Sequence, residues 1–579
     1  RAALDRAVAA SPDLAGALEL RARLHAESGR SAEALADLEA CLALPGEPGA
    51  RVLSHLSAAA ICDDALHDTS RALHHLKAAL ALAPESPEAL ARLARILGAE
   101  GRTAEAAGAL RRLVAAPGVP REALVEYLLA LAALEERLGE VEAAASDLRR
   151  ARATDPGHDD AHRRIIALEE RTANVETRLA SLESAAADAR DAALRADSHV
   201  AAARLLAGEL RARDRAALHL RAALEIDPGR AESRAVLAHL LEEISPADAA
   251  AEHRRLIAQE PLRVASWTAL YRHYERSQTH DRAYVAAAVL RWLGVPIPGP
   301  AAEQLLLEGA RQALPSPPPL DDEDLALLRA PGDAWPLAGV IEAAGDAIAA
   351  AVGEAPERHG DALRDHPIRR ALAEAAKTFG APAWELYPGT VGRVDVEPAV
   401  PYSVLVGPDV ARRTTAREQR FLVGRAAARL RTRSCLGELL PPAALAGWIA
   451  AAVRSVVPGY SPGEPVDEEM VRRIAKGIAR KARKPFEEAS RALALAPNPP
   501  DLTAWRNAAA ASADRAGLVL CGDVPAALGM LLREGARRAP EGPIAVARAS
   551  SRPDVLSLLA FAATEAHFIL RQRLRVAIA

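Results

Sequence analysis

The sequence predicts a mainly α-helical protein, in which an α-solenoid of helix pairs is followed by a mostly helical α+β domain with a small sheet. Proline returns about every 33 to 39 residues through the first half of the chain. Two amphipathic helical stretches lie between successive prolines, and short β-like runs interrupt the helices of the second half. The periodic prolines are Pro12, Pro45, Pro84, Pro117, Pro156, Pro228 and Pro261.

Small residues recur at fixed distances before these prolines. In three units, alanines stand twelve and five positions before the proline, and a leucine stands eight positions before it. Helices that cross closely need a small residue at the contact, and proline ends the second helix of the pair. Gly29, Gly101 and Gly139 are predicted to form the turns between paired helices, because glycine tolerates a left-handed backbone. The matching sets are Ala72/Leu76/Ala79, Ala144/Leu148/Ala151 and Ala216/Leu220/Ala223.

The repeating units resemble the tetratricopeptide repeat (TPR) family. Trp267, Leu270 and Tyr274 match the Trp-x-x-Leu-x-x-x-Tyr spacing of that family's first helix. The resemblance implies about eight TPR-like repeats over residues 1–298. It also implies a protein-protein interaction adaptor or scaffold, whose groove binds a peptide or helix of a partner protein.

The pattern changes after residue 298. Four prolines within Pro315–Pro319 and the acidic run Asp321–Asp324 predict an extended linker. The expected domains are therefore the solenoid (1–298), a capping helix with the Pro-rich acidic linker (299–335), and an α+β, mostly helical domain (336–579).

The third region is expected to alternate helices with a small meander of strands. Strand-like runs bounded by proline or glycine are followed by a long helix near residues 416–431. The expected strands are 383–388, 392–398 and 402–408, and the other expected helices are 336–352, 367–378, 442–456, 466–483, 485–495 and a helical block from 503 onward.

The long helix resembles the active helix of the HExxH zinc metallopeptidases. Residues 421–424 match the lead-in of that motif, but Arg425, Ala426 and Arg429 stand at its His, Glu and His positions. Further along, Ala510 stands where the family places its third zinc ligand. The resemblance therefore implies a degenerate, peptidase-like domain without metal ligands. The downstream positions that do fit the family are Asp514 and Gly517.

The chemistry of these residues predicts no enzyme, no cofactor and no metal site. A guanidinium group offers no lone pair to zinc, and an alanine cannot act as a general base. His158 and His162 have the i,i+4 spacing of zinc ligands, but they stand at a helix start, where a solvated face is expected. An alternative is a diverged hydrolase with its site in 336–579. Its candidate groups are Asp514, Glu418 and His567.

Composition limits the kinds of partner. The chain has 73 basic and 77 acidic residues, so no bulk attraction to nucleic acid is expected. Its four cysteines are far apart and form no CxxC pair, and no apolar run has the length of a membrane span. The abundance of alanine and arginine indicates a GC-rich bacterial genome. A cytoplasmic location is expected, although the start at Arg1 leaves open a missing signal peptide or further repeats.

Two groups of residues are candidates for partner binding. The first is the aromatic set Trp267, Tyr271 and Tyr274. The resemblance favours packing roles for Trp267 and Tyr274, whereas Tyr271 stands at a position that is normally small. The second is the basic stretch 471–484. It offers an alternative role in binding RNA or an anionic surface, although it lacks aromatic residues for base stacking. Its candidate contacts are Arg472, Arg473, Lys476 and Arg480.

Overall fold

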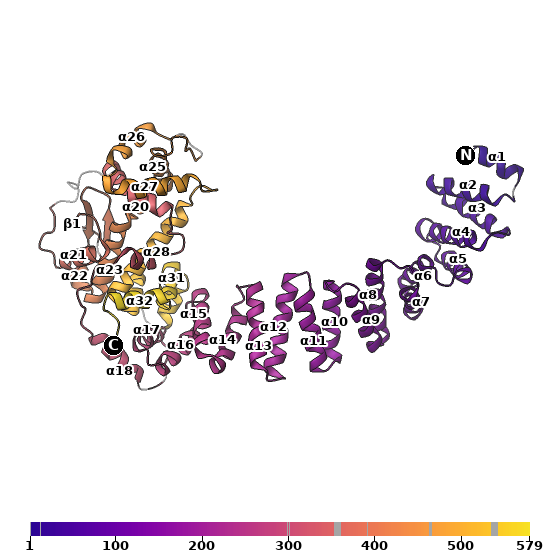
Figure 1. Ribbon diagram of the computed structural model, residues 1–579, viewed down its shortest axis with the longest axis horizontal. Helices are drawn as coiled ribbons and strands as arrows, with labels where there is room; N and C mark the ends of the chain where they lie inside the picture. Colours follow the sequence, from indigo (N-terminus) through magenta and orange to yellow (C-terminus); the bar gives the residue numbers. More distant parts are fainter. Residues whose placement is uncertain are drawn as a thin grey trace. The chain divides into compact units, whose positions relative to one another are not determined.

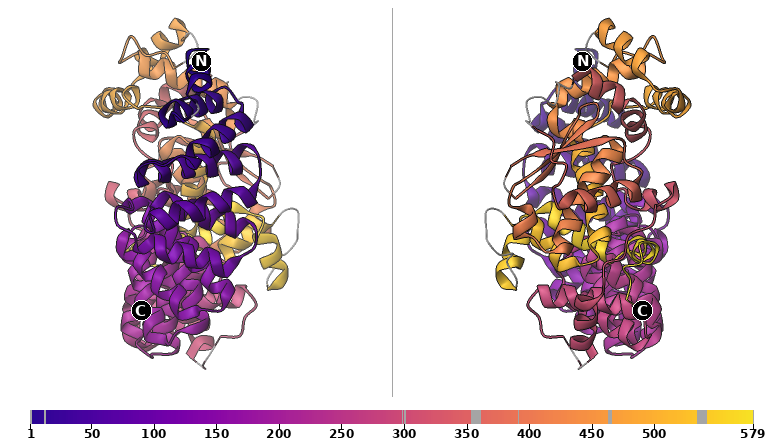
Figure 2. Two further views of the ribbon diagram at one scale, coloured as in Figure 1. Left: turned by 90° about the vertical axis from the view of Figure 1, so that its right-hand side faces the viewer. Right: turned by 90° about the vertical axis from the view of Figure 1, so that its left-hand side faces the viewer.

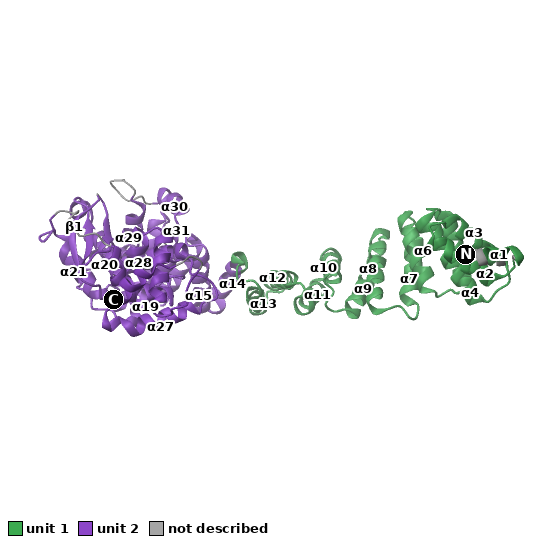
Figure 3. Cartoon of the chain, turned by 90° about the horizontal axis from the view of Figure 1, so that it is seen from above, with its two compact units in different colours: residues 1–233 green, residues 234–579 purple. Residues whose placement is uncertain are grey.

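The computed structural model describes residues 2–11, 13–297, 299, 301–352, 361–390, 392–462, 466–533 and 542–578. The chain divides into two compact units, Arg1–Ser233 and Arg234–Ala579 (Figure 3). Pro12, the first periodic proline, lies outside the described residues.

The first unit is a series of antiparallel helix pairs (Figure 1). Its turn glycines Gly29, Gly101 and Gly139 have φ values of 70°, 75° and 79°, which confirms their predicted left-handed conformation. The predicted contact alanines Ala72, Ala144 and Ala216 are fully buried. Its elements are α1 (Ala2–Ala10), α2 (Ala15–Glu27), α3 (Ser31–Ala43), α4 (Pro48–Ala60), η1 (Ile61–Ala65), α5 (Thr69–Leu82), α6 (Pro87–Ala99), α7 (Thr103–Ala115), α8 (Arg121–Leu138), α9 (Val141–Thr154), α10 (Asp159–Thr172), α11 (Val175–Asp188), α12 (Ala192–Gly208) and α13 (Arg213–Ile226).

The second unit begins before the predicted boundary at residue 298, because the last helix pair packs into the carboxyl-terminal core. Arg571 is fully buried and contacts Asp281 of this pair at 2.7 Å, and Glu565 accepts two hydrogen bonds from Arg282. α14 (Ala231–Ile244) crosses the division between the units. The helices that follow it are α15 (Pro246–Gln259), α16 (Val264–Arg276), α17 (His280–Trp292) and α18 (Ala301–Arg311).

The predicted linker packs against the rest of the second unit. Arg420 donates a hydrogen bond of 2.6 Å to the carbonyl oxygen of Pro315, and the amide of Leu320 donates to that of Thr378. The acidic run does not stay extended: Asp321 caps a short helix, α19 (Asp322–Leu327), by accepting from the amide of Asp324.

The remaining elements form the predicted mixture of helices around a small sheet. They are α20 (Leu337–Val352), α21 (Ile368–Phe379), β1 (Trp384–Pro388), β2 (Val394–Glu397), β3 (Tyr402–Val406), α22 (Val410–Arg413), α23 (Ala416–Thr432), α24 (Cys435–Leu439), α25 (Pro442–Arg454), α26 (Glu468–Gly477), η3 (Arg480–Ala482), α27 (Arg483–Ala494), α28 (Leu502–Cys521), α29 (Val524–Leu532), α30 (Pro543–Ala549), α31 (Pro553–Ala562) and α32 (Glu565–Arg573).

The three strands lie where short β-like runs were predicted (Figure 2). Their order is β1-β3-β2, with β1 parallel and β2 antiparallel to β3. Val404 of β3 pairs with Leu386 on one side and with Val396 on the other, and all three side chains are buried. Burial alternates along β2, as expected for a strand with one face in the core, whereas the central strand β3 is buried at four of its five residues.

Helices α23 and α28 cross at a pair of glycines. A Cβ atom on Gly424 would lie 3.0 Å from the Cα of Gly517, and one on Gly517 would lie 2.7 Å from the carbonyl oxygen of Phe421. Glycine at both positions therefore allows the backbones to approach closely. The start of α23 is fixed by a capping box between Thr415 and Glu418.

Candidate functional site

The residues that replace the peptidase motif form ion pairs. Nε of Arg425 on α23 lies 2.6 Å from Oδ1 of Asp514 on α28, and Arg429 contacts Glu438 at 2.9 Å. Burial raises the pKa of Asp514 and lowers that of Arg429. Ala426 is fully buried, and Ala510 is half-buried. This crossing thus contains cations bound to carboxylates, at the positions where zinc ligands would be needed.

A polar cavity of about 350 Å³ opens beside this crossing. Two of its arginines are held by neighbouring carboxylates: Arg552 contacts Asp554 at 2.7 Å, and Arg533 contacts Glu418 at 2.9 Å. Within the described ranges, no group of three or more histidine, cysteine, aspartate and glutamate side chains is arranged to hold a metal ion.

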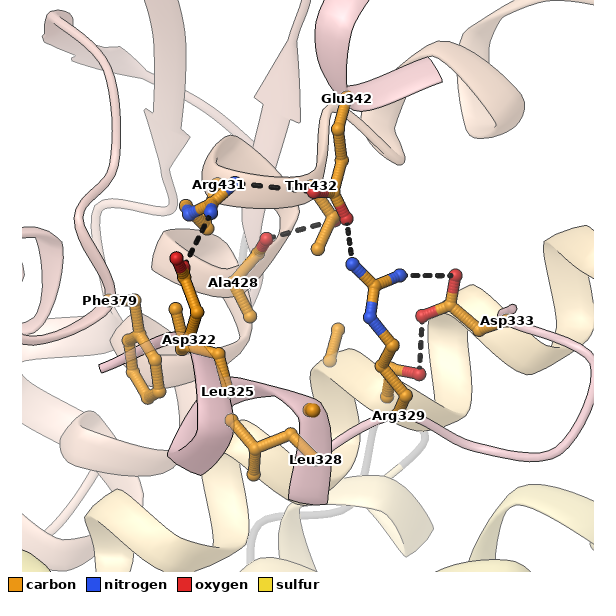
Figure 4. A pocket seen from close by; sticks show the side chains of 13 residues that line it. Asp322, Leu325, Leu328, Arg329, Asp333, Glu342, Phe379, Ala428, Arg431 and Thr432 are labelled. Carbon is orange, nitrogen blue, oxygen red and sulfur yellow. Dashed lines mark hydrogen bonds and ion pairs between the residues drawn. The ribbon is translucent and has the colours of Figure 1, made fainter. Parts of the chain in front are cut away.

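A second cavity, of about 310 Å³, lies near α19 and α23 (Figure 4). Arg329 contacts Glu342 and, at 3.6 Å, Asp333, which accepts a hydrogen bond of 2.7 Å from Ser512. Apolar side chains form the other wall, including Leu325. Arg431 of α23 also contacts Glu342, at 3.3 Å. These contacts connect the segment before α20 to α20, α23 and α28.

The alternative hydrolase groups do not share a site. His567 is fully buried, and its Nδ1 lies 2.9 Å from the carbonyl oxygen of Ala562. Burial and the nearby Arg571 lower the pKa of His567 to about 3. Glu418 caps α23 and contacts Arg533, whereas Asp514 contacts Arg425. Each candidate thus has its own structural partner.

The predicted aromatic set lies in the core. Trp267 and Tyr271 are each 1 % exposed, and Tyr274 is 4 % exposed. The indole of Trp267 donates to the carbonyl oxygen of Pro261, and Tyr274 stacks edge-on against Phe568 of α32. These side chains stabilise the last helix pair, and Tyr271 and Tyr274 also line a cavity of about 270 Å³ formed with α17 and α18. The burial of Trp267 and Tyr274 fits the packing roles expected for them, and part of the burial of Tyr274 comes from Phe568, almost 300 residues away. The burial of Tyr271 was not predicted.

The basic stretch is exposed but is not one helix. α26 ends at Gly477, and Arg480 lies in η3. Arg472 contacts Glu469 at 2.9 Å, and Arg473 donates to the carbonyl oxygen of Ala351. Lys476 and Arg480 are exposed and form no ion pair with any described residue. This surface therefore carries exposed positive charge.

The histidines with zinc-like spacing also have structural roles. Nδ1 of His158 accepts from the amide of Ala161 and caps α10. Contrary to the expected solvated face, His162 is fully buried, with its Nε2 2.6 Å from the carbonyl oxygen of Pro156.

The first unit carries a cavity that sequence reasoning did not single out. We call it the Tyr127 groove, and its volume is about 630 Å³. Its lining comes mainly from α6 and from Tyr127 on α8 with the two residues just before that helix; α6 and α8 are the first helices of successive pairs. Tyr127 is half-buried and is the only Phe, Trp or Tyr among residues 1–233. That isolation in the sequence is the signal that could have identified it. The lining residues are Asp64, Pro87, Glu88, Ala91, Arg92, Arg95, Val119, Pro120 and Tyr127.

The arginines of the Tyr127 groove are fixed by the preceding helix pair. Arg92 contacts Asp64 at 2.9 Å, and Arg95 contacts Asp63. Both carboxylates belong to η1, so α6 and the preceding pair together set the positions of the two guanidinium groups. The groove thus combines a partly exposed aromatic ring, apolar proline and valine contacts, and two positioned cations.

Among the helices that the structure describes, none by itself is long and apolar enough to cross a membrane. α31 and α32 meet that requirement only together, as a pair bent by 72°.

Solved structures of tetratricopeptide repeat proteins match part of this chain at low identity. Yeast Sti1 (a complex of its TPR2AB domain with pHSP90) is 13% identical; the match covers 42% of this chain and 90% of that one, with a TM-score of 0.24. A tetratricopeptide repeat protein from Parabacteroides merdae is 17% identical, covering 45% and 98%, with a TM-score of 0.23. YrrB, a TPR protein, is 16% identical, covering 31% and 89%, with a TM-score of 0.24.

No curated protein matches the sequence. The tetratricopeptide repeat family matches residues 65–131, a segment that runs from the end of η1 into α8 and contains most of the groove lining. Residues 65–131 therefore carry tetratricopeptide repeats.

Proposed function

We propose that this chain is a non-catalytic adaptor that binds a peptide segment or helix of a partner protein in the Tyr127 groove. The observation that carries the proposal is the position of Tyr127: the single aromatic ring of the first unit is partly exposed, inside the segment that matches the tetratricopeptide repeat family. Tyrosine and arginine are the residue types that most often dominate binding energy at protein interfaces.

The chemistry of the groove supports a peptide rather than a small polar ligand. Its volume of about 630 Å³ is large enough for several side chains, and its walls include Ala91, Val119 and two prolines. The side chain of Arg95 is 58% exposed while it contacts Asp63, so part of its guanidinium group faces solvent. Such a group can donate to the carbonyl oxygens or a carboxylate of a bound segment.

The second unit supports a scaffolding role in this proposal. Arg425 and Arg429 are bound by carboxylates, and neither can supply a lone pair to a metal ion. We infer an inactive, peptidase-like domain over 336–579. Elemental analysis of the purified chain tests this inference: stoichiometric zinc would contradict it.

Selection of peptides against the full chain tests the adaptor proposal. Selected peptides carrying a photoreactive group are expected to cross-link to α6 and α8 around Tyr127. Arg112, an exposed residue on α7 outside the groove lining, provides a matched control: Arg112→Ala is expected to leave cross-linking unchanged, whereas Arg92→Ala reduces it. Cross-links confined to other helices would contradict the proposal.

A further inference from the structure

Two buried histidines meet in the pair formed by α4 and α5. Nδ1 of His55 lies 3.1 Å from Nδ1 of His75, and the two side chains are 9 % and 4 % exposed. The other ring nitrogen of His75, Nε2, lies 3.7 Å from a carboxylate oxygen of Glu39 on α3. A polar chain of one carboxylate and two imidazoles therefore crosses three successive helices.

The same contacts recur further along the first unit, between two histidines that are half-buried. Nδ1 of His199 on α12 lies 3.0 Å from Nδ1 of His219 on α13, and Nε2 of His219 lies 3.4 Å from Glu183 on α11. Glu183, His199 and His219 each follow their counterpart in the first set by 144 positions. The repetition of both the spacing and the geometry indicates that these are built contacts rather than chance neighbours.

The two imidazoles of each pair cannot both be protonated and keep their hydrogen bond. Two Nδ1 atoms at about 3 Å form a hydrogen bond when one donates and the other accepts, so at least one ring must be neutral. If both rings are protonated, two N–H groups face each other and two like charges lie side by side. Glu39 favours a proton on His75, but that proton occupies Nε2 and leaves Nδ1 as the acceptor.

The surroundings oppose a second charge at these contacts. Burial, His75, Arg51 and His74 lower the pKa of His55 to about 4. Burial lowers the pKa of His75 despite Glu39, with His74 and Arg71 acting in the same direction as burial. At the second contact, burial, His219 and Arg195 lower the pKa of His199. Glu183 is also paired with Arg215, which further limits how far it can stabilise an imidazolium.

We propose that the two histidine pairs are acid-sensitive joints, at which the helix pairs α4–α5 and α12–α13 loosen when the second imidazole of each pair becomes protonated. The proposal concerns the stability of the first unit and does not depend on what the Tyr127 groove binds.

The direction of the effect follows from proton binding. An exposed histidine has a pKa of about 6.5, whereas that of His55 is about 4 in the folded state, so the opened state binds more protons between these values. Stability from the joint is complete above pH 6.5 and is lost as the pH falls toward 4. At pH 5.0, the ratio of opened to closed joint is expected to rise at least about tenfold relative to pH 7.5.

Hydrogen exchange of the full chain, read by mass spectrometry at pH 7.5 and pH 5.0 and corrected for the intrinsic exchange rates, tests the proposal. Protection of α4–α5 and α12–α13 is expected to fall at least about tenfold more than that of α8–α9, a pair that contains no histidine. An equal change in all three pairs would overturn it. This comparison uses the unmodified chain and needs no variant to fold.

Variants then assign the effect to the paired rings. His55→Leu combined with His75→Leu replaces both partners with apolar groups and is expected to abolish the acid response of α4–α5 alone. His74→Gln removes an exposed neighbour that acts less on the pKa values of the pair than burial does, and it is expected to leave most of the response intact. If the acid response of α4–α5 persists in the double variant, the pair is not its cause.

Discussion

Arg425 and Asp514 form an ion pair across the crossing of α23 and α28, with the carboxylate side chain only 4% exposed. The pair lies one residue from Gly424 and three from Gly517, where the two helices come closest. The positions that resemble a peptidase motif therefore contribute to packing in this chain.

Removing one partner of this pair should destabilise the second unit. Asp514→Ala leaves the Arg425 guanidinium without its carboxylate, and we expect a loss of about 3 kcal/mol in the free energy of unfolding. Urea unfolding read by tryptophan fluorescence measures it, because all six tryptophans follow residue 266. Replacing both partners, Arg425→Met with Asp514→Leu, should recover most of the loss. A double variant as unstable as the single one would contradict this account.

The glycine crossing should not tolerate a methyl group. In Gly517→Ala, the added Cβ would meet the carbonyl oxygen of Phe421 at 2.7 Å, and we expect about 1–3 kcal/mol of destabilisation. Gly447 on α25 is the matched control, because its Cβ would meet only the terminal carbon of Met470 at 4.0 Å. Gly447→Ala should be neutral or stabilising by about 0.5–1 kcal/mol in the same fluorescence assay. Equal effects at the two positions would show that the crossing has room to adjust.

The last helix pair should depend on the carboxyl-terminal helices. Asp281→Ala leaves the fully buried Arg571 without its carboxylate, and we expect about 3–5 kcal/mol of destabilisation in urea unfolding. Asp322, whose side chain is 95% exposed and 3.5 Å from Arg431, provides the control, with less than about 1 kcal/mol expected for Asp322→Ala. If Asp281→Ala unfolded at the same urea concentration as the original chain, the stability of the last helix pair would not depend on the carboxyl-terminal helices.

Acid should weaken the second unit through His567. Its pKa of about 3 lies below the ordinary value, so its contribution to stability is complete above about pH 6.5 and declines as the pH falls toward 3. Between pH 7.5 and 5.0 we expect a loss of about 2 kcal/mol, read by tryptophan fluorescence in urea. His567→Gln should reduce this pH dependence, whereas His280→Gln, at an exposed position, should not. If His567→Gln lost as much stability between pH 7.5 and 5.0 as the original chain, His567 would not be the source of the pH dependence.

The sequence predicted the features that depend on local patterns. Periodic alanine, glycine and proline predicted the helix pairs, and bounded apolar runs predicted the three strands. It did not predict the burial of Tyr271 or the early start of the second unit, because contacts such as Asp281 with Arg571 join residues 290 positions apart. The Tyr127 groove was missed because its lining comes from successive repeats, and no single repeat contains its pattern.

The affinity of a selected peptide for the chain and for Tyr127→Ala tests the central claim most directly. Loss of a central tyrosine contact typically costs about 2 kcal/mol, so isothermal titration should show roughly thirtyfold weaker binding. Circular dichroism should show unchanged helix content, because the ring is half-buried and lines a groove. Equal dissociation constants for the two proteins would contradict binding in the Tyr127 groove.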